Sequence, residues 1–189
     1  MRNSKTVVNK TAASNLVEIG DVLAYDLTYI NEGGANSNLE LCDLLPYNTE
    51  KAKTFHGAYG LKSVTVTVQN ADSWNTDGIT VKYAGTESVA YNSKDVLDRA
   101  ATMEKASSNG TLLPTTTKNT QDNSVTFTPD TMPIHTATGT SKLGILYLQL
   151  QNLPNAIVKV RVELAVTQTK DSVNALLTDR DKTVQQSND

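Results

Sequence analysis

The sequence predicts an all-β protein, an antiparallel two-sheet sandwich of about nine strands with one short helical insertion. The first observation is a long alternation in residues 157–167, where every second side chain is apolar and lysine, arginine and glutamate lie between them. The second is that such segments are separated by turns rich in Gly, Pro, Asn and Asp. The third is that strands and helices do not alternate regularly, which argues against a nucleotide-binding α/β fold.

Residues 17–46 are predicted to form two strands joined by a turn. Leu, Tyr, Leu and Tyr occupy alternate positions from 23 to 29, then N-E-G-G-A at 31–35 forms a turn, and the alternation resumes at 39–43 before Pro46. A first strand is expected at 6–11, with Val8 and Lys10 on one face. The sequence therefore predicts three strands before residue 46.

Further strands and one helix are expected along the rest of the chain. The predicted strands are 61–69, 79–84, 124–128, 143–151, 157–167 and 172–178. Residues 93–106 have helical composition, and Ser93 is a plausible N-cap. The helix lies within an insertion at 85–123, which is expected either to bind a ligand or only to pack Val96, Leu97 and Met103 onto a sheet edge.

Length and composition favour one domain and exclude several classes of function. The chain has 189 residues, a net charge of −3 and a single cysteine. We expect residues 1–5 to be a linker or added residues, 6–178 to be a single domain, and 179–189 to be a flexible tail or linker. The charge gives no case for nucleic acid or an anionic membrane, and Cys42 cannot form an internal disulfide. No apolar run is long enough for a membrane-spanning helix.

Catalytic and cofactor motifs are not evident in the sequence. His56 and His135 lie far apart in loop-like segments without an acid at ligand spacing, and Cys42 has no histidine near it in sequence. We therefore expect no metal, no cofactor and no enzymatic turnover.

Strand alternation brings one group of polar residues together. If Val8, Leu39 and Leu41 point inward, then Lys10 and Asp43 point inward as well, and Asn174 shares a face with Leu176. An amine, a carboxyl and a carboxamide would then meet in an apolar interior, where each alone is costly to bury. The alternatives are a plain ion pair between Lys10 and Asp43, or separated residues at the surface.

Four short motifs in this region resemble a known family. V-N-K at 8–10, E-I-G-D at 18–21, N-E-G-G at 31–34 and D-L-L-P at 43–46 resemble the immunoglobulin-like repeats of bacterial surface proteins. They are also similar to the related domains of Gram-positive pilins and collagen adhesins that form an internal isopeptide bond. The resemblance implies an immunoglobulin-like fold and an extracellular position, anchored to the cell wall or displayed at the cell surface as part of a longer precursor.

The resemblance also implies a function and a set of site residues. The domain would be a structural and adhesive module, a stalk or spacer, whose partners are neighbouring domains of the same polypeptide and a host matrix protein or glycan. The Lys10 amine would join the Asn174 carboxamide with help from Asp43. Desolvation would supply a neutral amine and a protonated acid.

The alternative function is a carbohydrate-binding module of a surface adhesin. Trp74, Tyr83 and Tyr91, with Tyr59, could offer flat apolar surfaces to sugar rings. Trp74 lies in an otherwise polar turn, so its exposure is expected.

Overall fold

The fold was obtained as a computed structural model, and the structure describes residues 2–11, 17–32, 38–46, 57–69, 78–136, 140–151 and 154–169. The predicted all-β sandwich is confirmed: the chain consists mostly of strands in antiparallel sheets, with a single α-helix in the described ranges. The predicted strand at 172–178 and the tail at 179–189 lie outside these ranges.

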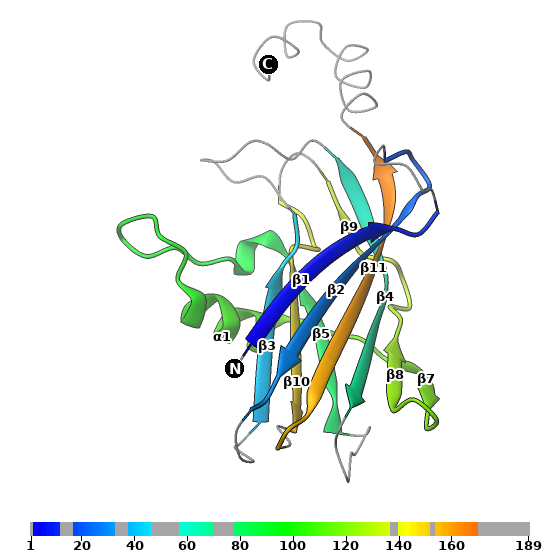
Figure 1. The fold of residues 1–189 in the computed structure, drawn as a ribbon. Coiled ribbons are helices and arrows are strands. Elements are labelled where there is room, and N and C mark those ends of the chain that lie inside the picture. Colours follow the sequence, from blue (N-terminus) through cyan, green and yellow to red (C-terminus); the bar gives the residue numbers. More distant parts are fainter. Residues whose placement is uncertain are drawn as a thin grey trace, which may run out of the picture.

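Two antiparallel sheets form the sandwich (Figure 1). The larger has seven strands in the order β1-β2-β11-β4-β8-β7, with β9 paired to β4, and the smaller has four in the order β3-β10-β5-β6. The strands of the larger sheet are β1 Arg2–Asn9, β2 Val22–Ile30, β4 Ala58–Gln69, β7 Thr115–Asn119, β8 Ser124–Phe127, β9 Ile134–His135 and β11 Ile157–Gln168. Those of the smaller are β3 Asn38–Leu44, β5 Thr80–Ala84, β6 Thr111–Leu112 and β10 Ile145–Gln151.

The alternating segments of the sequence fill the space between the sheets. β11 lies between β2 and β4, and its even-numbered residues face the smaller sheet, as the alternation predicts. The core consists mainly of valine and leucine, each of which stabilises the fold by about 1.5–3 kcal/mol when fully buried. Its most buried members include Leu61, Val64, Val66, Val68, Val125, Phe127, Leu143, Leu150, Val162 and Leu164.

The helix of the insertion packs on the outer face of the smaller sheet, while the strands β6 and β7 of the insertion are edge strands of the two sheets. Ala106 of helix α1 (Arg99–Asn109) is fully buried in a second cluster with Ile145 and Tyr147, and Met103 packs against that cluster. The insertion also contains a short 3-10 helix, Thr86–Ser88, and the strands β6 and β7, where a loop was expected.

The helix begins six residues later than predicted, and its cap is Asp98 and not Ser93. The Asp98 side chain accepts a hydrogen bond from Ala101 N at 3.0 Å. Ahead of it, the Asn92 side chain accepts from the backbone amides of Lys94 and Val96 and closes a tight turn. This turn leaves Val96 58% exposed, so the expected packing of Val96 is wrong.

The first strand begins earlier than predicted, and the opposite set of alternate residues faces inward. β1 begins at Arg2, so residues 2–5 belong to the sheet and are not a linker. Lys5 and Val7 lie opposite Leu27 and Tyr25 on the inward side of β2, while Val8 lies opposite Ala24 on the other side. The predicted inward position of Val8 and Lys10 is therefore wrong. β1 has two consecutive valines and lies at a sheet edge, so its sequence does not determine which face is buried.

Candidate functional site

Of the predicted site residues Lys10, Asp43 and Asn174, Asp43 has its side chain on the inward face, as expected from the alternation of β3. It lies on β3 with its side chain on the inward face shared by Leu39 and Leu41, and it is only 17% exposed. One carboxylate oxygen, Oδ1, accepts a hydrogen bond from Lys5 Nζ at 2.7 Å. The other, Oδ2, is buried and has no hydrogen-bond partner in the described part of the chain. A buried oxygen of this kind costs free energy unless something donates to it.

Lys5 connects the two sheets at this edge. It belongs to β1 of the larger sheet and contacts Asp43 on β3 of the smaller one. Its Nζ also lies 5.2 Å from the centroid of the Tyr25 ring, a cation–π geometry. The Lys5 side chain is 37% exposed and that of Asp43 is 17% exposed, so Lys5 is the more hydrated partner of the pair.

Burial dominates the electrostatics around Asp43. It raises the pKa of the Asp43 carboxyl, and the hydrogen bond and charge of Lys5 oppose that rise. Burial, together with the Asp43 charge, also raises the pKa of Tyr25 and raises the pKa of the Cys42 thiol to about 11. Cys42 is thus a protonated thiol near neutral pH, in agreement with a packing role.

A cavity of about 140 Å³ lies between the sheets beside Asp43. Its lining is predominantly apolar and comes from both sheets. The lining residues are Ser4, Leu27, Thr28, Tyr29, Leu41, Cys42, Asp43, Val64, Val81, Leu146, Leu148, Val158, Val160 and Val162.

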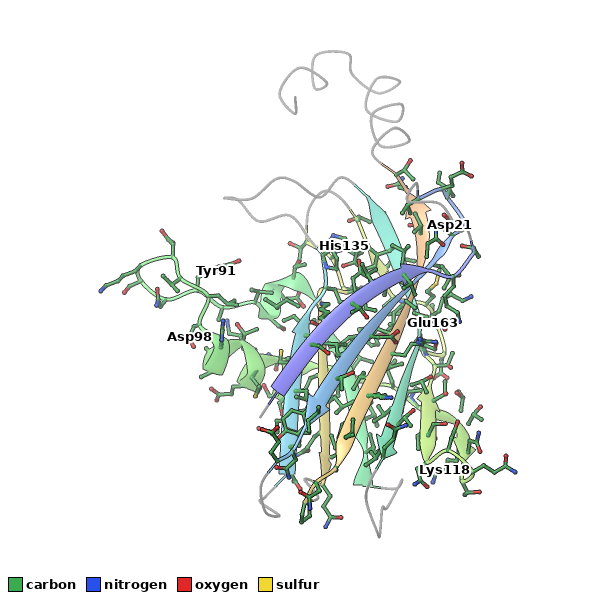
Figure 2. The ribbon with its side chains drawn as sticks, viewed as in Figure 1. Asp21, Tyr91, Asp98, Lys118, His135 and Glu163 are labelled. Atoms are coloured by element: carbon green, nitrogen blue, oxygen red, sulfur yellow. The ribbon has the colours of Figure 1, made fainter. Side chains whose placement is uncertain are left out.

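Lys10, the lysine chosen from the sequence, is not part of this site. It lies on the outer face of the larger sheet and donates a hydrogen bond to Glu163, which Figure 2 shows on β11. The same face carries a bidentate pair in which Arg161 donates to Asp26 at 2.7 and 2.8 Å. The structure brings Lys5 to Asp43 and leaves Lys10 elsewhere, so the predicted pairing of Lys10 with Asp43 is wrong. Asn174 lies outside the described residues.

The turn before β2 explains the E-I-G-D motif. Asp21 accepts hydrogen bonds from Glu18 N, from the Asn9 side chain and from the Thr11 hydroxyl, at 3.0, 2.7 and 2.8 Å. These bonds lower the pKa of the Asp21 carboxyl. Gly20 has a φ of +95°, a conformation that favours glycine. The motif thus joins the end of β1 to the start of β2.

His135 occupies a packed position and does not line the cavity beside Asp43. It is 2% exposed, its ring stacks on Tyr59 with centroids 4.8 Å apart, and Nδ1 lies 3.0 Å from the Leu143 carbonyl oxygen. Burial lowers the pKa of His135. A structural role therefore fits it, while His56 lies outside the described residues.

The aromatic residues considered for sugar binding have different environments. Tyr91 is 47% exposed and lies in the segment before α1 that projects from the sheets (Figure 2). Tyr83 packs partly buried against the main core, and Tyr59 is buried, so neither offers an open ring face. Trp74 lies outside the described residues.

The described ranges contain no group of three or more His, Cys, Asp or Glu residues that could hold a metal ion. They also contain no helix long and apolar enough to cross a membrane. No protein-family model matches the chain, and no curated protein matches it either.

Proposed function

We propose that this chain is a structural and adhesive module, a spacer domain of a larger bacterial cell-surface or pilus-like protein, without turnover chemistry. The observation that carries the proposal is the relative direction of β1 and β11. Arg2 and Ile157 both lie opposite Ile30, so the two strands begin at the same end of the larger sheet and run in parallel, separated by β2. β11 therefore ends at the opposite end of the sandwich from the start of β1 (Figure 1).

This arrangement suits a domain that transmits tension along a chain of domains. A pull on Arg2 and on the end of β11 acts along the strand axes, so the hydrogen bonds between β1 and β2 are loaded together. A pull across the strands would break the same bonds one after another at much lower force. The neighbouring domains of the same polypeptide would be the primary partners, at an extracellular site on the cell wall or cell surface.

Single-molecule pulling tests the proposal with a matched control geometry. Attachment at Arg2 and Thr169 loads β1 in shear, and attachment at Arg2 and Glu32 peels β1 from β2, because both of those residues lie at one end of the pair. We expect unfolding force in the first geometry well above that in the second. Equal, low forces in both geometries would contradict a load-bearing role.

An internal amide bond is a second part of the proposal, with Lys5 in place of Lys10 as the amine. The Lys5 nitrogen would attack the carboxamide carbon of Asn174, the new C–N bond would replace the C–NH₂ bond, and one ammonia would leave. Asp43, 2.7 Å from Lys5 Nζ, is placed to take the lysine proton and pass it to the leaving group. Such a link would constrain the unfolded chain, by the loop-closure reasoning applied to disulfides.

Intact-mass spectrometry of folded protein tests the bond. We expect the wild-type mass to lie one ammonia below the sequence mass. A Lys10→Ala variant should show the same deficit relative to its own sequence mass, and a Lys5→Ala variant should show none. A loss of one water that also depends on Lys5 would point to a bond directly to Asp43. An unshifted mass would remove the amide from the proposal and leave the spacer function standing.

The second candidate function is a carbohydrate-binding module, and the exposure of Tyr91 is the observation that favours it. An exposed ring on a projecting segment is suited to stacking against a sugar. Glycan-array binding that is lost in Tyr91→Ala and in Trp74→Ala variants, but kept in Tyr83→Phe, would support this function over the spacer.

A further inference from the structure

The interior of the sandwich contains a cavity of about 140 Å³ that leucine and valine line for the most part. Leu41 and Leu148 of the smaller sheet and Val64 and Val160 of the larger sheet belong to its wall. Protein interiors are close-packed, and voids larger than a water molecule are few. The side chains on this wall therefore lack van der Waals contacts that a guest molecule would supply.

The small polar residues of the lining and Asp43 offer a guest little to hydrogen-bond. Ser4 and Thr28 lie opposite each other in the β1–β2 pair, one position away from the inward-facing Lys5, so their side chains project from the outer face. Cys42 packs against the second cluster, on the outer face of the smaller sheet. Asp43 Oδ1 accepts from Lys5, and Oδ2 has almost no surface that a water molecule can reach. The cavity is therefore apolar in its chemistry.

We propose that this cavity binds a small, neutral, apolar molecule of the size of one aromatic ring, of the class of benzene and toluene. An engineered apolar cavity of about 150 Å³ in another protein binds benzene, so the volume here is sufficient for one ring. This site goes beyond the spacer function and does not depend on it.

Charge and polarity select this class of ligand. Lys5 and Asp43 already pair with each other, so a charged guest would lose its hydration and find no free partner of opposite charge in the lining. A hydroxyl group on the guest would be buried without a hydrogen bond. A hydrocarbon incurs neither cost, and it replaces the void with contacts to leucine and valine.

Entry into the cavity does not require a permanent opening. Ser4 of β1 borders the cavity, and β1 lies at the edge of the larger sheet, paired with β2. Elements with exposed backbone hydrogen bonds open locally at a lower free-energy cost than core strands. Local opening of β1 would therefore give a guest a path to the interior.

An NMR titration that observes methyl groups tests the proposal with toluene and phenol, because the two probes share a ring and differ in the hydroxyl. In wild-type protein we expect saturable toluene binding, with phenol at least tenfold weaker. Toluene should shift the methyl signals of Leu41, Leu148, Val64 and Val160. Leu41→Trp and Val160→Phe, which fill the cavity from opposite sheets, should prevent binding. The matched control is Val8→Trp, which adds the same bulk on the outer face of β1 and should preserve it.

Each outcome has a defined reading. Toluene binding that shifts the cavity methyl groups, exceeds phenol binding and is lost in the filled variants supports the proposal. Absence of shifts up to the solubility limit of toluene, equal affinities for the two probes, or binding that survives in both filled variants would overturn it. Thermal melts verify that each variant is folded. If neither filled variant folds, the wild-type titration still decides, because toluene shifts confined to methyl groups outside the lining overturn the proposal.

Discussion

His135 and Asp43 are both ionisable side chains buried in the sandwich, but the fold holds them in different ways. His135 is stacked on Tyr59, with Nδ1 against the Leu143 carbonyl oxygen. Asp43 has one oxygen on Lys5 and the other without a partner in the described residues, beside a cavity. Burial favours the neutral form of both, because it lowers the pKa of His135 and raises that of Asp43.

The difference separates a side chain that supports the fold from one that is available for chemistry or binding. The His135 ring fills its site and contacts a second ring, so its removal leaves a void. Asp43 pairs with Lys5 of the other sheet and borders a cavity, so the packing around it is already incomplete. We therefore expect stability to depend strongly on His135 and weakly on Asp43.

Removing the His135 ring should have the largest effect. His135→Ala deletes a 2% exposed ring and its stacking with Tyr59, and we expect a loss of about 2–4 kcal/mol in the free energy of unfolding. Urea denaturation measures it. His135→Phe keeps an aromatic ring against Tyr59 and should lose less, so equal losses for the two variants would contradict the role given to stacking.

In protein without the internal amide bond, removing the Lys5 charge should have the next largest effect. Lys5→Met keeps most of the stem but leaves both Asp43 oxygens unpaired, so we expect a loss of about 1–3 kcal/mol near neutral pH. The matched control is Lys10→Met, whose lysine pairs with Glu163 on the outer face and should cost about 1 kcal/mol or less. Equal losses in urea denaturation would show that the Lys5–Asp43 pair contributes no more to stability than the Lys10–Glu163 pair on the outer face.

The contrast between Lys5 and Lys10 also shows where sequence reasoning ends. Alternation correctly placed Asp43 inward, because Leu39 and Leu41 fix the phase of β3. It could not fix the phase of β1, where Val7 and Val8 adjoin and both remain about half exposed. The sequence does show that Lys5 shares a face with Val7 and Asn9. Only the pairing of β1 with β2 shows that this face is the inward one.

The predicted fold succeeded where one face is strongly apolar and failed where local hydrogen bonds decide. β11 and β4 have long valine alternations that only a buried sheet face satisfies, and both strands were predicted. The start of α1 depends on Asn92 and Asp98, whose side chains cap backbone amides in competition with a longer helix. The cavity depends on how two sheets meet, which no single segment encodes.

The pH dependence of stability should have opposite signs at the two sites. The pKa of His135 is lowered from 6.5, so its contribution is complete above pH 6.5 and is lost as the pH falls below that value. The pKa of Asp43 is raised from 3.8, so its contribution is complete below pH 3.8 and is lost as the pH rises through its folded pKa. Urea midpoints across pH should show both trends in wild-type protein.

Two variants assign these trends to their residues. His135→Gln should remove the loss of stability below pH 6.5, and Asp43→Asn should remove the loss above pH 3.8. If either slope survives its variant, a different group is responsible for it.

In protein without the internal amide bond, neutralising Asp43 should have the smallest effect on stability. Asp43→Asn keeps the shape of the side chain and removes a charge that burial disfavours, while Lys5, 37% exposed, can turn its ammonium to water. Replacing a buried ionic group by a neutral one is often neutral or stabilising, so we expect a change within about 1 kcal/mol at neutral pH. In the Asp43→Asn background, Lys5→Met should then lose most of its own cost, because the buried charge that it left unpaired is absent. Urea denaturation of the double variant measures that coupling, and additive losses would mean that the ion pair does not link the two sheets energetically.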